Sequence, residues 1–211
     1  GFDGSLTRRA PAPEALEPAI YRPGVFDWSE EDVILVSGGA RGITASIALE
    51  LSRKTGAKAA LVGRTSVDSR RGSGGSGNEV AALLEKYGRF GLTARYYSCD
   101  VSQRSEVLRT VAKIVREMGP VTGVIHGAAV NIPRPVLQVS AKEAMEEIAP
   151  KVLGAVHLIE ALQDQPVKIF AGLSSIIAYI GMPGNGWYGF SNEALEMILR
   201  RYHVERPEVR T

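Results

Sequence analysis

Hydrophobic residues along the chain alternate between short continuous runs and stretches with helical spacing. A continuous run, VILV, lies within Asp32–Ser37 and predicts a buried strand, and apolar positions at helical spacing follow it in Ile43–Lys54. The same alternation predicts further strands at Ala59–Val62, Thr93–Ser98, Gly123–His126 and Val167–Leu173, and further helices at Glu79–Tyr87, Arg104–Met118, Ala141–Leu162 and Tyr188–Tyr202. Strands that alternate with helices form parallel sheets, so we expect an α/β fold with a Rossmann-like, doubly wound sheet.

Two segments depart from this pattern. Residues 1–30 are rich in proline and small residues up to Pro23, which is typical of an interdomain linker. Residues 65–78 contain GSGGSG and predict a flexible loop, either an inserted linker or a natural surface loop. The remaining chain, within 31–211, is long enough for one hydrophobic core, so we expect one domain.

Composition excludes several functions. Lysine and arginine number 25 against 23 aspartates and glutamates and are scattered, so nothing favours a nucleic-acid partner. Cys99 is the single cysteine, and the three histidines have no neighbouring cluster of ligand residues, so we expect no metal. No apolar run is long enough to cross a membrane, and Gly1–Arg9 lacks the apolar region of a signal peptide. We therefore expect a cytoplasmic protein.

The segment Ser37–Thr44, SGGARGIT, lies between the first strand and the first helix. In this place a dinucleotide pyrophosphate meets a helix N-terminus. A glycine such as Gly38 allows the tight turn, and Gly42 allows backbone to approach the phosphates. The predicted cofactor contacts here are Gly38, Gly39, Arg41, Gly42 and Ile43. Thr44 stands where a third glycine is common, which puts close helix-to-strand packing in question, and an ordinary glycine turn is the alternative.

Arg64 ends the second strand, where NAD-specific proteins place an acidic residue. A guanidinium pairs with phosphate in a forked geometry, so Arg64, with Arg41, favours the 2′-phosphate of NADPH. The alternative is that both are solvated surface arginines.

Residues after the third and fourth strands complete the predicted cofactor site. Asp100, followed by Val101, would accept a hydrogen bond from the adenine amino group or, alternatively, cap the helix that begins near Arg104. Ala128 and Ala129 are small enough to let the backbone approach the nicotinamide ribose, whereas His126 before them is expected to be structural.

Ser174 and Ser175 follow the fifth strand, and Tyr188 and Asn192 share one face of the last helix. This pattern resembles the short-chain dehydrogenase/reductase family, in which a serine and a tyrosine hold a carbonyl while the nicotinamide delivers hydride. The usual motif of that family has lysine at position 192. Here position 192 is asparagine, and a lysine is available at Lys151.

That exchange resembles the ketoreductase domains of modular polyketide and fatty acid synthases, in which the lysine and the asparagine trade places. The resemblance covers Asp32–Arg201 and includes GGARGIT, LVGRT, VIHGAAV, APKVLGA, LSSIIA and YGFSNEAL. Among synthases it is closest to the iterative enediyne or polyunsaturated-fatty-acid types. Because the family usually adds further strands, we expect the sheet to lack its C-terminal strands in this chain.

The resemblance implies NADPH-dependent reduction of a β-ketoacyl thioester, carried by an acyl carrier protein, to the β-hydroxyacyl form. Adjacent synthase domains would be the partners. In that reaction Tyr188 would give the proton, Ser175 would orient the carbonyl, and a cationic Lys151 would make the phenol a better acid. Asn192 would hold a water or Lys151. Ser174 is a rival for the role of Ser175.

Other interpretations stay open. A non-catalytic, nucleotide-binding remnant of such a domain would explain the Thr44 departure and the expected lack of strands. A free-standing reductase of small ketones is a third possibility, against which the Tyr188 and Asn192 pattern and the proline-rich leader argue. Trp187 and Met182 either line a channel for the acyl chain or pack in the domain.

Overall fold

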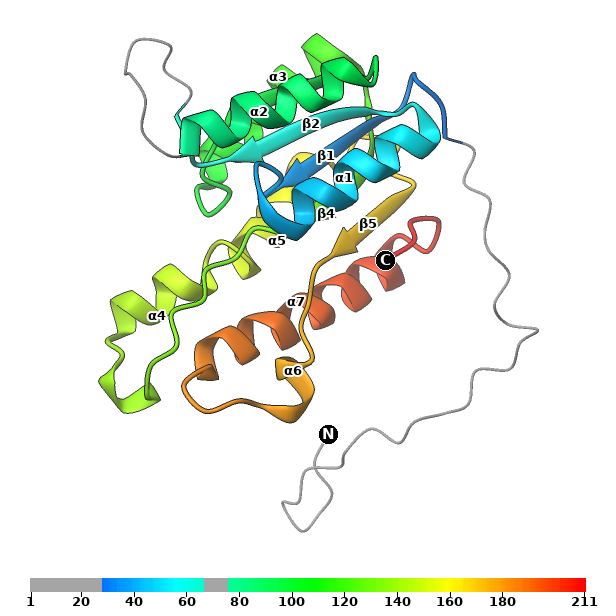
Figure 1. Ribbon diagram of the computed structural model, residues 1–211. Helices are drawn as coiled ribbons and strands as arrows, with labels where there is room; N and C mark the ends of the chain where they lie inside the picture. The colour runs from blue at the N-terminus through cyan, green and yellow to red at the C-terminus, as the bar shows by residue number, and fades with distance from the viewer. Residues whose placement is uncertain (1–27, 67–75) are drawn as a thin grey trace, which may run out of the picture.

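The computed structural model describes residues 28–66 and 76–211, and its centre is a parallel β-sheet (Figure 1). The strands are β1 Val33–Ser37, β2 Lys58–Gly63, β3 Ala94–Ser98, β4 Val121–His126 and β5 Ile169–Gly172. Their order is β3-β2-β1-β4-β5, and every neighbouring pair is parallel. The predicted α/β, Rossmann-like fold is confirmed.

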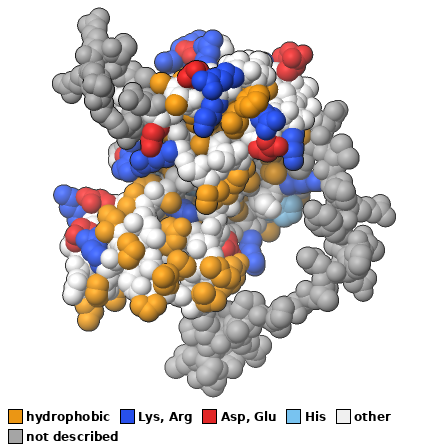
Figure 2. All heavy atoms as spheres, in the orientation of Figure 1, with side chains coloured by type: hydrophobic (Ala, Val, Ile, Leu, Met, Phe, Trp, Pro, Cys, Tyr) orange, Lys and Arg blue, Asp and Glu red, His pale blue; other side chains and the backbone are white. Residues whose placement is uncertain are grey.

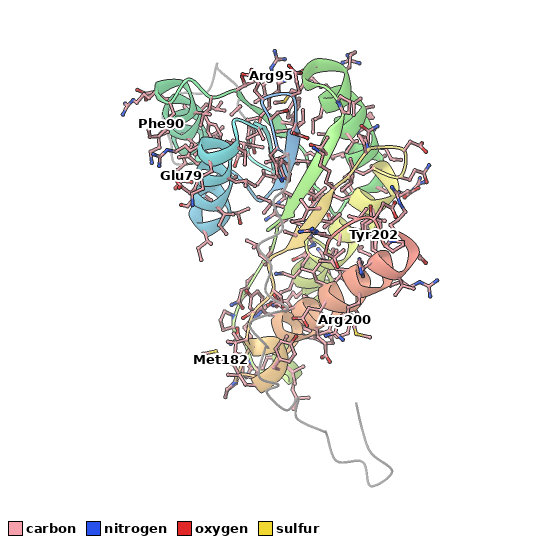
Figure 3. The ribbon with its side chains drawn as sticks, turned by 90° about the vertical axis from the view of Figure 1, so that its right-hand side faces the viewer. Glu79, Phe90, Arg95, Met182, Arg200 and Tyr202 are labelled. Atoms are coloured by element: carbon pink, nitrogen blue, oxygen red, sulfur yellow. The ribbon has the colours of Figure 1, made fainter. Side chains whose placement is uncertain are left out.

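Helices cover both faces of this sheet. One face packs against α1 Gly42–Thr55 and α2 Ser76–Arg89. The other packs against α3 Arg104–Met118, α5 Val152–Ala161 and α7 Gly186–Glu205. Three shorter helices, η1 Val136–Gln138, α4 Ala141–Ile148 and α6 Ile177–Ile180, lie beyond the carboxyl ends of the strands. Figure 3 shows this arrangement from the side, with Arg95 of β3 and Met182 after α6 at opposite ends of the molecule.

The helix expected at Ala141–Leu162 is two helices, so that prediction is wrong. Pro150 has no N–H to donate, and its ring clashes with the carbonyl four residues earlier, so the helix breaks there. Irregular backbone bonds replace the regular ladder: Lys151 N donates to Ile148 O at 3.2 Å, and Gly154 N donates to Ala149 O at 3.0 Å. The break sets Lys151 between α4 and α5.

Two predicted boundaries also change. The loop expected at 65–78 ends earlier, because α2 begins at Ser76; residues 67–75 of that loop lie outside the described residues. Residues 1–27 of the expected linker likewise lie outside them. Trp28, also assigned to the linker, packs on the sheet, since a Cβ atom at Gly123 would lie 2.5 Å from its ring. Trp28 of the expected linker therefore belongs to the domain.

The outer edge of β5 carries one more contact. Arg210 forms a parallel bridge with Ile169, and Phe170 N donates to Arg210 O at 2.8 Å. That this chain lacks the further C-terminal strands of the family stays a prediction. None of the described helices combines the length and apolar character needed to cross a membrane. Within 28–66 and 76–211, no group of three or more metal-ligating side chains is placed to hold an ion.

Burial of α5 against the sheet predicts a large effect for Leu158→Ala. Leu158 is buried in the larger core cluster, so its truncation should lower the free energy of unfolding by about 2–5 kcal/mol. Met197→Ala on the exposed side of α7 is the matched control and should change stability by less than about 0.5 kcal/mol. Denaturant unfolding of both variants checks this, and equal effects would contradict the packing described here.

Candidate active site

A cavity of about 560 Å³ opens at the carboxyl ends of the strands. The strand order reverses between β1 and β4, and the crevice at such a reversal is where nucleotides bind in open α/β sheets. The turns after β1, β2, β3 and β4 all contribute to its walls. The lining residues are Gly38, Ala40, Arg41, Thr44, Val62, Gly63, Arg64, Thr65, Cys99, Asp100, Val101, Gly127, Ala128, Ala129 and Pro150.

The turns after β1 and β4 touch each other at Gly38. A Cβ atom at Gly38 would lie 2.8 Å from Ala128 N and 2.8 Å from Gly127 C, which is closer than real contacts allow. Its φ of +69° is also a conformation that favours glycine. Gly42, with φ +64°, begins α1 after the turn. The first glycine therefore serves both the turn and the close approach of two backbones.

Thr44 and Gly127 form a complementary pair across this crevice. A Cβ atom at Gly127 would lie 2.2 Å from Thr44 Oγ1 and 2.7 Å from Thr44 Cγ2. The missing side chain at Gly127 thus provides the space that a third glycine in the turn would otherwise provide. Thr44 therefore packs closely because Gly127, the residue after β4, has no side chain.

Seven of the ten predicted cofactor residues line the cavity: Gly38, Arg41, Arg64, Asp100, Val101, Ala128 and Ala129. The other three do not. Gly39 lies against β1, where a Cβ atom would be 2.6 Å from Val36 Cγ1, and Ile43 is 76% exposed at the start of α1, next to Gly42.

Sequence analysis missed other lining residues, among them Gly63, Thr65 and Cys99. Gly63 and Cys99 directly follow predicted strands and Thr65 lies three residues after one, so the rule that ligands bind at the carboxyl ends of strands would have indicated them.

The side chain of Asp100 belongs to a turn. Its Oδ1 accepts hydrogen bonds from Ser102 N at 2.9 Å and from Ser102 Oγ at 2.7 Å. The cap of α3 is Gln103, and no side chain caps that helix end. The alternative role of Asp100 as the helix cap is therefore wrong, and its side chain lies at the cavity wall.

The two arginines at the cavity are exposed. The Arg41 side chain is 73% exposed and lies 4.0 Å from Glu79 Oε2, and Arg64 is exposed at the end of β2. An exposed ion pair of this length contributes little stability, so Arg41 could turn from Glu79 to a phosphate at small cost.

The predicted catalytic residues lie where β5, α5 and α7 meet. Lys151 is 3% exposed, and its Nζ donates to Leu173 O at 2.6 Å and to Asn192 Oδ1 at 2.8 Å. The same Nζ lies 5.6 Å from the centre of the Tyr188 ring. Asn192 in turn donates from Nδ2 to Tyr188 O at 2.7 Å. Lysine, asparagine and tyrosine from two distant segments thus form one cluster.

The two candidate serines have different surroundings. Ser174 is exposed, and its Oγ donates to Glu196 Oε1 at 2.7 Å, an acceptor that Tyr179 also uses through Oε2. Ser175 is half-buried, and its Oγ accepts a bond from Ile177 N at 3.3 Å at the start of α6. A hydroxyl that only accepts still has its proton to donate, so Ser175 is the better placed of the two.

Burial lowers the pKa of Lys151 to about 8. The cause is desolvation, since both acceptors of its ammonium are uncharged oxygen atoms. At neutral pH the group is still predominantly cationic. A buried cation beside a phenol ring can stabilise negative charge that develops on the phenol oxygen.

Trp187, next to Tyr188, packs against Phe190 in an edge-to-face contact with ring centres 6.3 Å apart. This contact agrees with the packing alternative. Met182 is exposed beyond α6.

A Rossmann-like sheet with a glycine turn at its reversal point defines the class of dinucleotide-binding α/β proteins. The model of the KR domain family matches residues 33–207. The chain therefore belongs to the KR domain family, ketoreductase domains of the short-chain dehydrogenase/reductase type, which confirms the predicted resemblance. The finer placement among iterative synthases stays a prediction.

Similar proteins include large synthases. Polyketide synthase PksN of Bacillus subtilis is 29% identical over 175 residues, which are 82% of this chain and 3% of that protein. Polyketide synthase ThaG of Burkholderia thailandensis is 30% identical over 83% of this chain and 3% of its own length. The chain thus spans a small part of the relatives that it matches.

Solved ketoreductases share the fold. An N-terminal ketoreductase from the macrolactin assembly line has a TM-score of 0.77 and 26% identity, and the match covers 87% of this chain and 36% of that one. A ketoreductase domain from the bacillaene assembly line has a TM-score of 0.74 and 27% identity, over 89% of this chain and 44% of that one.

The pairing of Thr44 with Gly127 predicts that Gly127→Ala lowers the free energy of unfolding by about 1–3 kcal/mol, because the added methyl group overlaps Thr44. In a Thr44→Ala background the same change should cost less, and urea unfolding of the four proteins measures this coupling.

Gly88→Ala on α2 is the control, because a Cβ atom there has no neighbour within 4 Å, and it should not destabilise the domain. Additive effects of the Gly127 and Thr44 changes would contradict the contact.

Proposed function

We propose that this domain reduces a β-ketoacyl thioester, held on an acyl carrier protein within a polyketide synthase, to the β-hydroxyacyl form with NADPH. The observation that carries the proposal is the cluster at the carboxyl edge of the sheet, in which the buried Lys151 ammonium contacts Asn192 and lies over the Tyr188 ring. The family and its polyketide synthase relatives support the substrate class and the adjacent synthase domains as partners.

The residues of the cavity fit a dinucleotide with a 2′-phosphate. Gly38 has no side chain where a Cβ atom would fill the turn, so backbone can approach a pyrophosphate. Arg64, which follows β2, and Arg41, which precedes α1, both line the cavity, and a guanidinium there would give a 2′-phosphate a forked pair of hydrogen bonds. A short-chain oxidoreductase of the same fold, 19% identical with a TM-score of 0.76, was solved in complex with NADP.

The chemistry assigns separate tasks to the side chains. NADPH supplies the hydride that the carbonyl carbon receives. Negative charge then grows on the carbonyl oxygen, where the Ser175 hydroxyl donates a hydrogen bond and the Tyr188 hydroxyl donates the proton. Lys151 stabilises the phenolate that remains. Asn192 fixes Lys151 through Oδ1 and binds its own helix through Nδ2.

Apolar side chains beside this cluster suit an acyl chain. Ile176, Ile180 and Met182 are exposed around α6, and Val136 and Leu137 are exposed on η1. Figure 2 shows hydrophobic side chains gathered over this end of the molecule. Such a surface would shield a thioester chain from water while its carbonyl reaches Tyr188.

Tyr188→Phe tests the proposal, because it removes one hydroxyl and keeps the ring over which Lys151 lies. We expect kcat for reduction of a β-ketoacyl thioester to fall by about 10²–10⁴-fold. NADPH binding, followed by nucleotide fluorescence, should be unchanged. Ser174→Ala, which removes only the contact to Glu196, is the matched control and should keep most of the activity.

The outcome also decides between the functions considered. Nucleotide binding without turnover in the unaltered protein would favour a non-catalytic remnant. Equal rates with free small ketones and with carrier-bound substrate would favour a free-standing reductase.

The pKa of Lys151 predicts how the rate of reduction changes at alkaline pH. The group is cationic below about pH 8 and neutral above it, so kcat for reduction should fall as pH rises through about 8. Lys151→Arg keeps its charge at every accessible pH, so its lower activity should show no such fall. Rate profiles between neutral and alkaline pH for both proteins measure this, and an identical limb in both would contradict the assignment.

A further inference from the structure

His126, the last residue of β4, lies buried between the glycine turn and the lysine. Its Nε2 is 2.8 Å from the backbone oxygen of Lys151, and its Nδ1 is 2.5 Å from Ser37 Oγ. Both Ser37 and His126 are inaccessible to solvent. The ring therefore joins the end of β1 to the backbone of Lys151.

The partners of the ring determine where its proton resides. A carbonyl oxygen can only accept, so Nε2 must carry the hydrogen that binds Lys151 O. In a neutral ring Nδ1 is then an acceptor, and the Ser37 hydroxyl donates to it. Burial, with a smaller contribution from the nearby Lys151 charge, outweighs the hydrogen bond to Lys151 O and lowers the pKa of His126 to about 4, so the ring is neutral at physiological pH.

The backbone at Lys151 has few regular helix bonds of its own. Pro150 breaks the helix, and the bond from Ala155 N to Lys151 O is long, at 3.3 Å. The bond from His126 to the same oxygen is shorter by 0.5 Å, the difference between 3.3 Å and 2.8 Å. The imidazole is therefore the closest donor recorded for this carbonyl.

The surroundings keep the imidazole in this orientation. A Cβ atom at Gly154 would lie 3.0 Å from His126 Cε1, so the first turn of α5 leaves room for the ring only because residue 154 is glycine. Phe170 of β5 meets the ring edge-on, with ring centres 6.5 Å apart. The ring has little space in which to turn.

We propose that His126 is a positioning residue for the reductase reaction: by holding the Lys151 carbonyl at the helix break, it places the Lys151 ammonium beside Tyr188 and Asn192. This inference rests on the proposed function. In an uninterrupted helix, regular backbone hydrogen bonds would hold this carbonyl. At the break, the neutral His126 ring provides that support. A neutral donor also adds no charge that would compete with the ammonium for its acceptors.

Two substitutions separate the two bonds of the ring. In His126→Gln the terminal amide reaches the place of Nε2, so the bond to Lys151 O is kept and the bond to Ser37 is lost. In His126→Asn the shorter side chain reaches only the place of Nδ1, so the reverse holds. We expect His126→Gln to retain most of kcat and His126→Asn to lower it about a hundredfold, the size of effect that a 1 Å misplacement can produce. KM and NADPH binding should change little in either.

A purely structural role would give a different result. Both variants would then lose thermal stability and kcat to the same extent, and that outcome would overturn the proposal. So would full activity of His126→Asn.

The pKa of Lys151 can be measured without turnover, by NMR titration of protein with isotope-labelled lysine. The Lys151 signal is identified as the one that Lys151→Arg removes. The pKa of about 8 should persist in His126→Gln and move toward the ordinary lysine value in His126→Asn, where the ammonium is no longer held in its buried place. An unchanged Lys151 pKa in His126→Asn would count against the proposal.

A last test uses the unaltered protein, so its result does not depend on whether a variant folds. Nitrogen NMR of His126 at neutral pH should show a proton on Nε2 and none on Nδ1. The opposite tautomer has no hydrogen to share with Lys151 O and would overturn the inference. Absence of turnover in the unaltered protein would instead sink the reductase assignment, while the NMR results would still decide whether His126 holds Lys151.

Discussion

The cluster of predicted catalytic residues in this domain depends on one buried cation. The Lys151 ammonium is removed from water, and its two recorded partners are the uncharged oxygens of Leu173 and Asn192. Burial without a carboxylate is unfavourable for charge, which is why the pKa of this lysine falls to about 8. A carboxylate partner would hold the lysine more firmly but would also neutralise its field. Neutral acceptors leave that field directed at Tyr188, where the proposed reaction would use it.

The phosphate end of the site is governed by steric space. Two strand ends meet so closely that Gly38 cannot carry a Cβ atom, and Thr44 fits only because Gly127 opposite has no side chain. In the sequence, Thr44 departs from the glycine pattern that is common in dinucleotide-binding turns. In three dimensions the requirement is for one small residue at a contact between α1 and β4, and either partner can provide it. The departure therefore carries no argument against nucleotide binding.

Much of the fold could be predicted from sequence because β1, β2 and β4 are short, buried and largely apolar runs, and because α2, α3 and α4 each have a clear apolar face. The prediction of one helix at Ala141–Leu162 failed because hydrophobic spacing continues through Pro150, and the local effect of proline was given too little weight. At the site, the family resemblance pointed to Tyr188, Asn192 and Lys151, and the structure brings these three side chains together. The acceptor at Leu173 could not be found in this way, because it is a backbone atom that any residue would supply.

Lys151 lies at the helix break after Pro150, outside the helix that carries Tyr188 and Asn192, unlike a site in which one helix carries both the tyrosine and the lysine. Where a lysine follows the tyrosine by one turn of the same helix, that helix fixes the distance between the two side chains. Here the lysine comes from another segment, so β4 through His126, β5 through Leu173 and α7 through Asn192 must all meet at Lys151. The geometry of the site is therefore a property of the assembled sheet. Distant changes that shift β4 or β5 relative to α7 would alter the surroundings of Lys151 without replacing any residue of the proposed catalytic cluster.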